Sequence, residues 1–186
     1  MYICLSKIYK FNFMITYFTK FLYFYYKNAY LINKLIFTQS RNEELYLVLG
    51  LQDNFQNRLN FQILHLSLIM ISLDSNKNKK FFRIRFSNKI FKIFLHQIDL
   101  FLREKGYGDK TIEKKIFEIS NLAIIQFNNY YSVLISDDKK LFNKIIKNNF
   151  NINSKINNIS GLKKYIDIQY EKLSNVDFFA KINQDT

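Results

Sequence analysis

Two long runs of regularly spaced apolar residues meet at the sequence GYG, positions 106–108. Before it, apolar residues recur every three or four positions across 90–102, and after it the same spacing runs across 112–134. This spacing places the apolar side chains on one face of a helix. The sequence therefore predicts two long amphipathic helices joined by a tight corner.

The corner contains the residues that such a turn needs. Glycine adopts a left-handed backbone conformation at no steric cost, so Gly106 can end the first helix. Asp109 or Thr111 supplies a side-chain oxygen that can cap the start of the second helix. Every helical hairpin needs a corner of this kind, so these features alone indicate structure rather than function.

Composition supports a helical fold for the whole chain. The 186 residues are 48% apolar, with no proline and only 4 glycines. Sandwich and Rossmann-type folds use more turn residues than this. We therefore predict an all-α, single-domain irregular helical bundle of about five to seven helices, which tertiary burial must stabilise because Ile, Phe, Tyr and Asn are mediocre helix formers.

The spacing predicts further helices before the corner. One covers 28–41, and a short turn within 42–49 ends at Gly50. Asp53 can cap a helix from 55 to 73, which is apolar on two faces and should be central. The polar stretch 74–80 reads as a loop. The alternating residues 81–86 are compatible with a strand, but they merge into the next helical run and favour helix.

After the corner, the Asp137-Asp138 pair is placed to start a helix over 139–149. The Asn-rich stretch 150–160 has poor periodicity and predicts a loop, and a last helix follows over 162–173. The expected organisation is an aromatic and basic N-terminal extension (1–27), a helical domain (28–174) and a C-terminal tail (175–186).

The corner residues also form a more particular pattern. They read Asp99, Leu102-Arg103-Glu104, Gly106, Gly108-Asp109, Thr111-Ile112 and Lys114-Lys115. A second segment upstream reads Leu45-Tyr46, Leu49-Gly50, Asp53, Arg58 and Leu64-His65-Leu66. Together they resemble the ubiquinol–cytochrome c reductase assembly chaperones over roughly 30–170. The second segment departs from the family pattern at Asn54 and at the aromatic residue after the arginine, which is displaced to Phe61.

The resemblance implies a non-catalytic assembly factor for the cytochrome bc complex. Such a protein would bind newly made cytochrome b, peripherally, at the cytoplasmic or mitochondrial-matrix face of the inner membrane. A small co-chaperone or the ribosome would be further partners, and neither cofactor nor metal is implied. The expected partner-binding residues are Asp99, Arg103, Glu104, Gly106, Gly108 and Asp109 at the corner, with Arg58 and His65 upstream. Asp99 and Arg103 lie four apart and should form an ion pair.

The charge has two interpretations. The chain carries 28 basic and 15 acidic residues, a net charge of +13. Such an excess favours an anionic partner, namely RNA, a ribosome or anionic lipid. It also follows from the Lys-, Asn- and Ile-rich composition that AT-rich genomes impose. A basic RNA- or DNA-binding protein is therefore the alternative function, although only five arginines are available for bidentate phosphate contacts.

No catalytic or metal-binding pattern emerges. The single cysteine, Cys4, cannot form an internal disulfide, and His65 and His96 lie too far apart in sequence to suggest metal-ligand spacing. No nucleophile elbow or phosphate-binding glycine loop is present. We expect no enzymatic activity. Within a central helix, His65 is expected to hydrogen-bond in the core.

Two basic segments each allow more than one interpretation. Residues 1–30 are aromatic and apolar but interrupted by lysines, which disfavours a spanning helix. They fit a peripheral membrane contact, a helix packed on the domain or an unstructured extension. A basic patch of Lys79, Lys80, Arg83 and Arg85 could meet headgroups or RNA, or be solvated.

Overall fold

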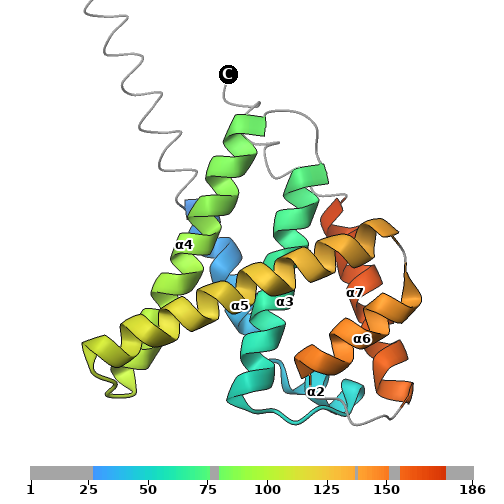
Figure 1. Cartoon of the computed structure of the whole chain (residues 1–186), viewed down its shortest axis with the longest axis horizontal. Helices are drawn as coiled ribbons and strands as arrows, with labels where there is room; N and C mark the ends of the chain where they lie inside the picture. Colours follow the sequence, from blue (N-terminus) through green and yellow to red (C-terminus); the bar gives the residue numbers. More distant parts are fainter. Residues whose placement is uncertain (1–26, 76–79, 137, 151–155, 175–186) are drawn as a thin grey trace, which may run out of the picture.

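The computed structural model describes residues 27–75, 80–136, 138–150 and 156–174, and all regular secondary structure in these residues is helical (Figure 1). A first helix includes residues 27–39. The helices that follow are α2 (Glu43–Leu49), α3 (Phe55–Ser75), α4 (Lys80–Glu104), α5 (Asp109–Ser136), α6 (Lys139–Phe150) and α7 (Ile156–Ser174). The predicted all-α bundle is confirmed. Residues 1–26 and 175–186, most of the predicted extension and the tail, lie outside the described residues.

Helix α3 is the centre of the bundle. In Figure 1 it stands between α4 on one side and α6 and α7 on the other, while α5 crosses in front, and α3 contacts all four helices. Its two apolar faces enter two separate core clusters. Leu59 and Ile63 belong to the cluster shared with α4, and Phe61 and Leu64 to the cluster shared with α6 and α7. The predicted central, two-faced helix is therefore confirmed.

The helix before α3 ends as predicted, but α3 itself starts differently. Gly50 adopts φ 62° and ends α2. Asn54, not Asp53, caps α3, because its Oδ1 accepts a hydrogen bond from the Asn57 N–H at 2.9 Å. The prediction for Asp53 is wrong because its carboxylate pairs with Arg58 at 2.5 Å instead.

Predictions for the later helices are partly confirmed. Asp138 caps α6, since its Oδ1 accepts from the Lys140 N–H at 2.8 Å. The segment 81–86 is helical within α4. The predicted loop over 150–160 is wrong in its second half, because α7 already begins at Ile156. Burial of Ile159 against the second cluster outweighs the weak helix propensity of the asparagines around it.

Arg83 does not belong to an exposed basic patch. Its side chain is buried, and Nη1 donates to the backbone carbonyl oxygens of Leu73, at 3.1 Å, and Asp74. These carbonyls lie in the last turn of α3, where no helical N–H is available to them. The patch prediction is therefore wrong for Arg83, which instead donates hydrogen bonds to the last carbonyl groups of α3. Lys79 lies outside the described residues.

Across the described ranges, none of the helices combines the length and the apolar character needed to cross a bilayer.

Candidate functional site

The corner between α4 and α5 ends α4 with paired backbone hydrogen bonds. The Gly106 N–H donates to the Arg103 carbonyl at 2.9 Å, and the Tyr107 N–H donates to the Leu102 carbonyl at 3.2 Å. Gly106 takes φ 79° to make this geometry possible. This is the Schellman arrangement, in which a left-handed glycine satisfies the last carbonyls of a helix. The predicted role of Gly106 is confirmed.

The start of α5 differs from the prediction. The Gly108 carbonyl accepts the first helical hydrogen bonds, from the N–H groups of Thr111 at 2.9 Å and Ile112 at 3.0 Å. Gly108 therefore occupies the cap position, and the predicted capping by Asp109 or Thr111 is wrong. Asp109 lies in the first turn of α5, where its negative charge faces the positive end of the helix dipole and its carboxylate is directed to Arg103.

Arg103 connects the two helices across the corner. Its Nε donates to Asp99 Oδ2 at 2.9 Å, which confirms the predicted ion pair, and its Nη1 donates to Asp109 Oδ1 at 2.7 Å. Hydrogen bonds to Asp99 first, and then to Asp109, raise the pKa of Arg103. The Arg103 side chain remains 50% exposed and that of Asp109 85% exposed. The corner therefore presents an ordered set of charges that a partner can reach.

Replacing Gly106 with alanine tests the corner. No atom lies within 4 Å of the position that an added Cβ would occupy, so the cost comes from the positive φ alone. We expect the free energy of unfolding to fall by about 1 kcal/mol. Gly108→Ala is the control, because Gly108 has equal space and no positive φ. Urea denaturation that shows equal stability for both variants would contradict this account.

Three adjoining hollows follow the C-terminal part of α4 and share Phe101. Their volumes are about 850, 360 and 540 Å³, and neighbouring hollows have lining residues in common. We call them together the aromatic furrow, after the rings that line them: Tyr30, Phe37, Phe55, Phe101 and Tyr107. The furrow begins between the first helix and α4 and ends beside the corner.

Tyr30, Phe55 and Tyr107 are about half exposed, whereas Phe37 and Phe101 are partly buried against the core. Phe55 and Phe101 stack with centroids 5.6 Å apart and planes 10° apart. The Phe55 ring is 50% exposed, although its position on the apolar stripe of α3 predicted burial. Lys105 Nζ lies 5.7 Å from the Phe101 centroid, and Lys115 Nζ lies 5.2 Å from that of Tyr107. The furrow thus offers apolar surface bordered by ammonium groups.

Cations outnumber anions along the furrow. The cationic side chains are Lys34, Arg41, Arg58, Lys105 and Lys115, and the acidic ones are Asp53, Glu104 and Glu118. Arg58 neutralises Asp53, and its hydrogen bond lowers the pKa of that carboxyl group. A ligand that complements this surface is an apolar peptide segment that carries acidic groups.

The structure brings some of the predicted site residues to the furrow but not all. Arg58 and Glu104 line it, and the corner residues lie at its end. The aromatic residues were missed, because Phe55 and Phe101 look like ordinary members of helical apolar stripes. The packing of α3 against α4 leaves Phe55 half exposed and Phe101 at the edge of the core, where both line the furrow.

His65 lies elsewhere, in the second core cluster. It is buried, its Nδ1 lies 2.7 Å from the Phe61 carbonyl oxygen, and its Nε2 lies 2.6 Å from the Tyr165 hydroxyl. A neutral ring that donates from Nδ1 and accepts at Nε2 satisfies both contacts. The predicted core hydrogen bond is confirmed, and the structure does not join His65 to the corner.

Comparison with known proteins decides the family. A family model for the ubiquinol–cytochrome c chaperones matches residues 47–180. The chain belongs to this family. The crystal structure of the Cbp3 homologue from Brucella abortus has the same fold, with a TM-score of 0.75, 16% sequence identity, and coverage of 90% of this chain and 91% of that chain. No curated protein matches the chain in sequence.

The match to the chaperone family includes the corner and most of the furrow. Phe55, Phe101 and Tyr107 lie inside the matched segment, whereas Tyr30 and Phe37 precede it. The described part of the chain contains no group of His, Cys, Asp and Glu side chains that could hold a metal ion. The groups that line the furrow are apolar, cationic and ion-paired.

Proposed function

We propose that this family member is a non-catalytic assembly chaperone that binds newly made cytochrome b. Membership of the ubiquinol–cytochrome c chaperone family supports a role in assembling the cytochrome bc complex. The aromatic furrow is the observation that carries the proposal of a binding site. Its rings, some half exposed and some partly buried, provide a surface on which an apolar segment is shielded from water.

The chemistry of the furrow fits a membrane-protein client. Phe55, Phe101 and Tyr107 offer rings to apolar side chains, while Lys105 and Lys115 are placed to meet acidic loop residues or the carboxyl ends of client helices. The Arg103 ion pairs hold the corner in one geometry beside the furrow. In this proposal the corner orients the client and the furrow covers it.

The proposed location is peripheral, at the cytoplasmic or matrix face of the inner membrane, where a client emerges during synthesis. A small co-chaperone or the ribosome would be a further partner there. A nucleic-acid ligand suits the furrow less well. Arg58 is already paired with Asp53, and Lys105 and Lys115 stand beside apolar rings instead of forming a continuous row that a phosphate backbone could follow.

Affinity capture from membranes tests the proposal. The tagged full-length chain should co-purify newly made cytochrome b. Phe55→Ser should reduce that capture about tenfold, because it removes an exposed ring and the stack on Phe101. Arg103→Glu should also reduce it, because the reversed charge repels Asp99 and Asp109 and releases the corner.

The matched control is Val48→Ser on α2. Val48 is 84% exposed and apolar but lies outside the furrow, so capture should be unchanged. Circular dichroism would establish that each variant remains folded. Folded Phe55→Ser and Arg103→Glu proteins that both capture cytochrome b as well as the unmodified chain would refute the furrow as the binding site. An unmodified chain that captures no cytochrome b would refute the client.

A further inference from the structure

The outer side of α5 carries a row of exposed apolar side chains. Phe117, Ile124, Tyr131 and Ile135 follow one another at intervals of seven, seven and four residues, which places them on one stripe of the helix. Phe117 is 67% exposed and Ile135 66%. The residues of α5 that enter the core, from Ile112 to Val133, lie on a different face. Tyr131 stacks on Phe127 of the same helix, whereas the described part of the chain leaves Phe117, Ile124 and Ile135 about half exposed or more.

This part of α5 also lacks charge. Not one acidic or basic residue occurs from Ile119 to Ser136, although 23% of the chain is charged. At 1.5 Å per residue this uncharged stretch is about 27 Å long. The outward positions between the apolar residues hold Asn121, Asn128 and Ser132, which are exposed. A helix face that met only water would ordinarily carry charged residues.

Lysines flank the uncharged stripe. On α6 the exposed lysines are Lys139, Lys140, Lys144 and Lys147, and on the first turns of α5 they are Lys110 and Lys114. Four acidic residues also lie there, of which Asp109, in the first turn of α5, pairs with Arg103. Glu113 is exposed, Glu118 lies 4.0 Å from Lys114, and Asp138 caps α6. The cations exceed the acidic groups by two, counting six lysines and these four carboxylates.

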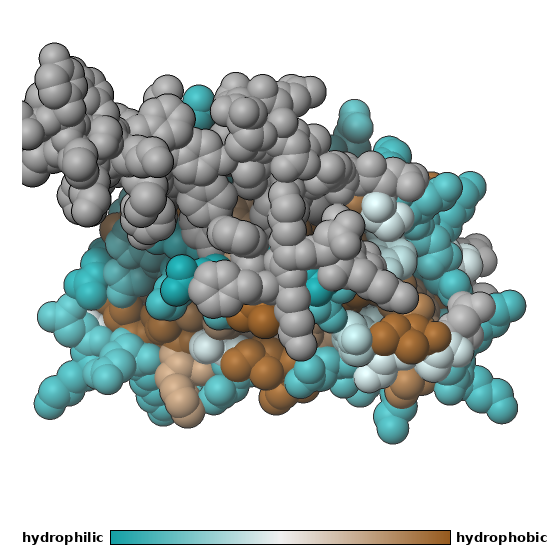
Figure 2. All heavy atoms as spheres, turned by 90° about the horizontal axis from the view of Figure 1, so that it is seen from above, coloured by the Kyte–Doolittle hydropathy of each residue, from teal (hydrophilic) through white to brown (hydrophobic). Residues whose placement is uncertain are grey.

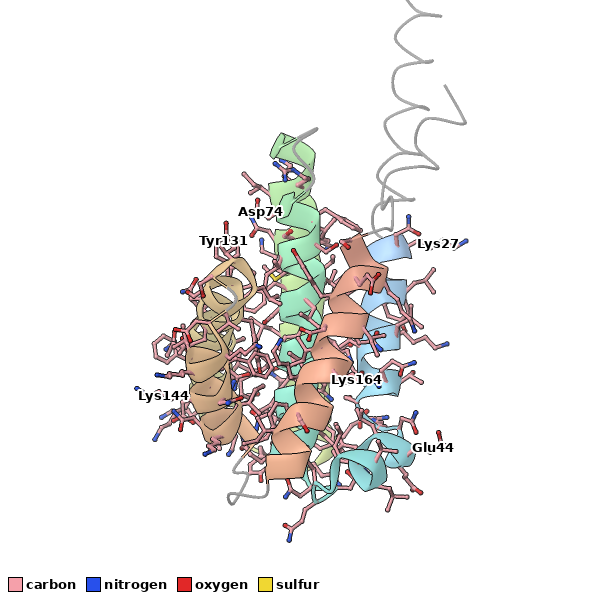
Figure 3. All side chains as sticks on the ribbon, turned by 90° about the vertical axis from the view of Figure 1, so that its right-hand side faces the viewer. Lys27, Glu44, Asp74, Tyr131, Lys144 and Lys164 are labelled. Atoms are coloured by element: carbon pink, nitrogen blue, oxygen red, sulfur yellow. The ribbon has the colours of Figure 1, made fainter. Side chains whose placement is uncertain are left out.

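The pictures place Tyr131 of the stripe and Lys144 of α6 on one side of the molecule. In Figure 2, brown hydrophobic atoms gather along the lower edge, which is the side that faces the viewer in Figure 1 and along which α5 runs. In Figure 3, Tyr131 of α5 and Lys144 of α6 both lie at the left of the protein, whereas Lys164 and Glu44 lie on other helices away from that edge.

We propose that this α5–α6 face binds the surface of an anionic lipid bilayer, with α5 parallel to the membrane plane. Ile124, Ile135 and Phe117 would enter the boundary between headgroups and acyl chains, and the α6 lysines would contact anionic headgroups. The stripe itself offers no cation from Ile119 to Ser136, where a phosphate backbone lying along it would need one, which disfavours nucleic acid. Helix α6 carries four lysines and no acidic residue, a density that suits anionic headgroups better than the core of a protein interface.

This proposal is separate from client binding. The face lies on α5 and α6, uses none of the aromatic furrow, and does not depend on residues 1–26. Vesicles without cytochrome b can therefore test it, so that its failure would leave the proposed chaperone function untouched, and the converse also holds.

The absence of tryptophan from the chain allows a clean optical test. Full-length Ile124→Trp would report from the proposed face and Val48→Trp from α2, which is also exposed. With vesicles of phosphatidylcholine and phosphatidylglycerol, Ile124→Trp emission should shift to the blue and be quenched by brominated acyl chains. Val48→Trp emission should do neither.

Flotation with the same vesicles tests the lysines. Each lysine near an anionic surface raises the partition coefficient about fivefold, so Lys144→Gln with Lys147→Gln should lower it about twenty-five-fold. Lys164→Gln on α7 is the matched control and should change it little. Ile124→Asn with Ile135→Asn should lower partitioning further, including at high salt, where electrostatic attraction is screened.

Several results would overturn the proposal. Ile124→Trp emission that is unchanged by vesicles, or that shifts no more than Val48→Trp emission, would show that the face does not enter the bilayer. Equal flotation of the α6 lysine variant and the Lys164→Gln control would show that the lysines are not oriented to the membrane. Emission that shifts only after addition of a protein or an RNA would assign the face to that macromolecule instead.

Discussion

Replacing Phe61 with alanine should lower the free energy of unfolding by about 3 to 5 kcal/mol. The ring is fully buried and packs against three other elements. Its centroid lies 5.3 Å from that of Tyr46 on α2, 4.7 Å from that of Phe150 on α6 and 6.4 Å from that of Tyr165 on α7. Removing it would leave a cavity where these helices meet α3, and the total stability of a domain is only about 5 to 15 kcal/mol.

Phe55→Ala provides the matched control for this prediction. It is the same substitution on the same helix, but the Phe55 ring is half exposed and stacks on only one neighbour. Its cost should be about 1 kcal/mol. Urea denaturation followed by circular dichroism measures both variants. Costs that do not differ between Phe61→Ala and Phe55→Ala would show that α2, α6 and α7 do not depend on the Phe61 ring.

Acid should destabilise the protein through His65. Burial lowers the pKa of His65 from 6.5 to about 4, against a smaller opposing effect from its hydrogen bond to the Phe61 carbonyl. Burial also raises the pKa of Tyr165 to about 12, so its hydroxyl keeps the proton that it donates to His65 Nε2. Protonated His65 would have no lone pair at Nε2 to accept the hydrogen bond from Tyr165, and it would carry a buried charge.

The sign of the effect follows from the two pKa values. As pH falls below 6.5, the unfolded chain binds a proton at His65 while the folded chain does not, so stability is lost. The loss continues until the pH reaches about 4, and below that it is constant. Between about pH 7.5 and about pH 4.5 this residue should account for a loss of about 2 to 3 kcal/mol.

Comparison with His65→Gln isolates this contribution. Carboxyl groups titrate in the same range, but they do so in both proteins. The unmodified chain should lose about 2 to 3 kcal/mol more than His65→Gln between the two pH values. Urea denaturation at each pH measures the difference. An equal loss in the two proteins would show that His65 protonates as readily in the folded state as in the unfolded chain.

The core of α3 was predictable because it depends on spacing alone. Leu59 and Ile63 fall on one helical stripe and Phe61 and Leu64 on another, and the structure buries both stripes. Gly106 was predictable for the same reason, since the end of a helix needs a left-handed residue close by in sequence. Where the interaction is local, residue order determines it.

The errors involve residues whose partners are distant or compete with nearer ones. Asp53 and Asp109 both have capping chemistry, but an arginine holds each carboxylate in an ion pair instead. The sequence placed Arg83 in a basic patch, whereas in the structure it lies beside the end of α3 and donates to two backbone carbonyl oxygens there. Capping and ion pairing were both chemically reasonable for the two aspartates, as were a surface patch and helix-end hydrogen bonds for Arg83. The relative positions of the segments that carry the partners decided which interaction formed.

The two parts of the candidate site, the corner and the furrow, differ in the same way in how far the sequence predicts them. The charged corner around Arg103 could be located from its residues, because a helix end and a helix start adjoin it in sequence. The furrow could not, because Phe55 and Phe101 are 46 positions apart, and their stacking beside an open hollow depends on how α3 packs against α4. Sequence alone determined which faces are apolar and where helices end, because both depend on neighbours a few residues away. Tertiary structure decided which apolar residues stay accessible, because exposure depends on what the rest of the chain leaves uncovered.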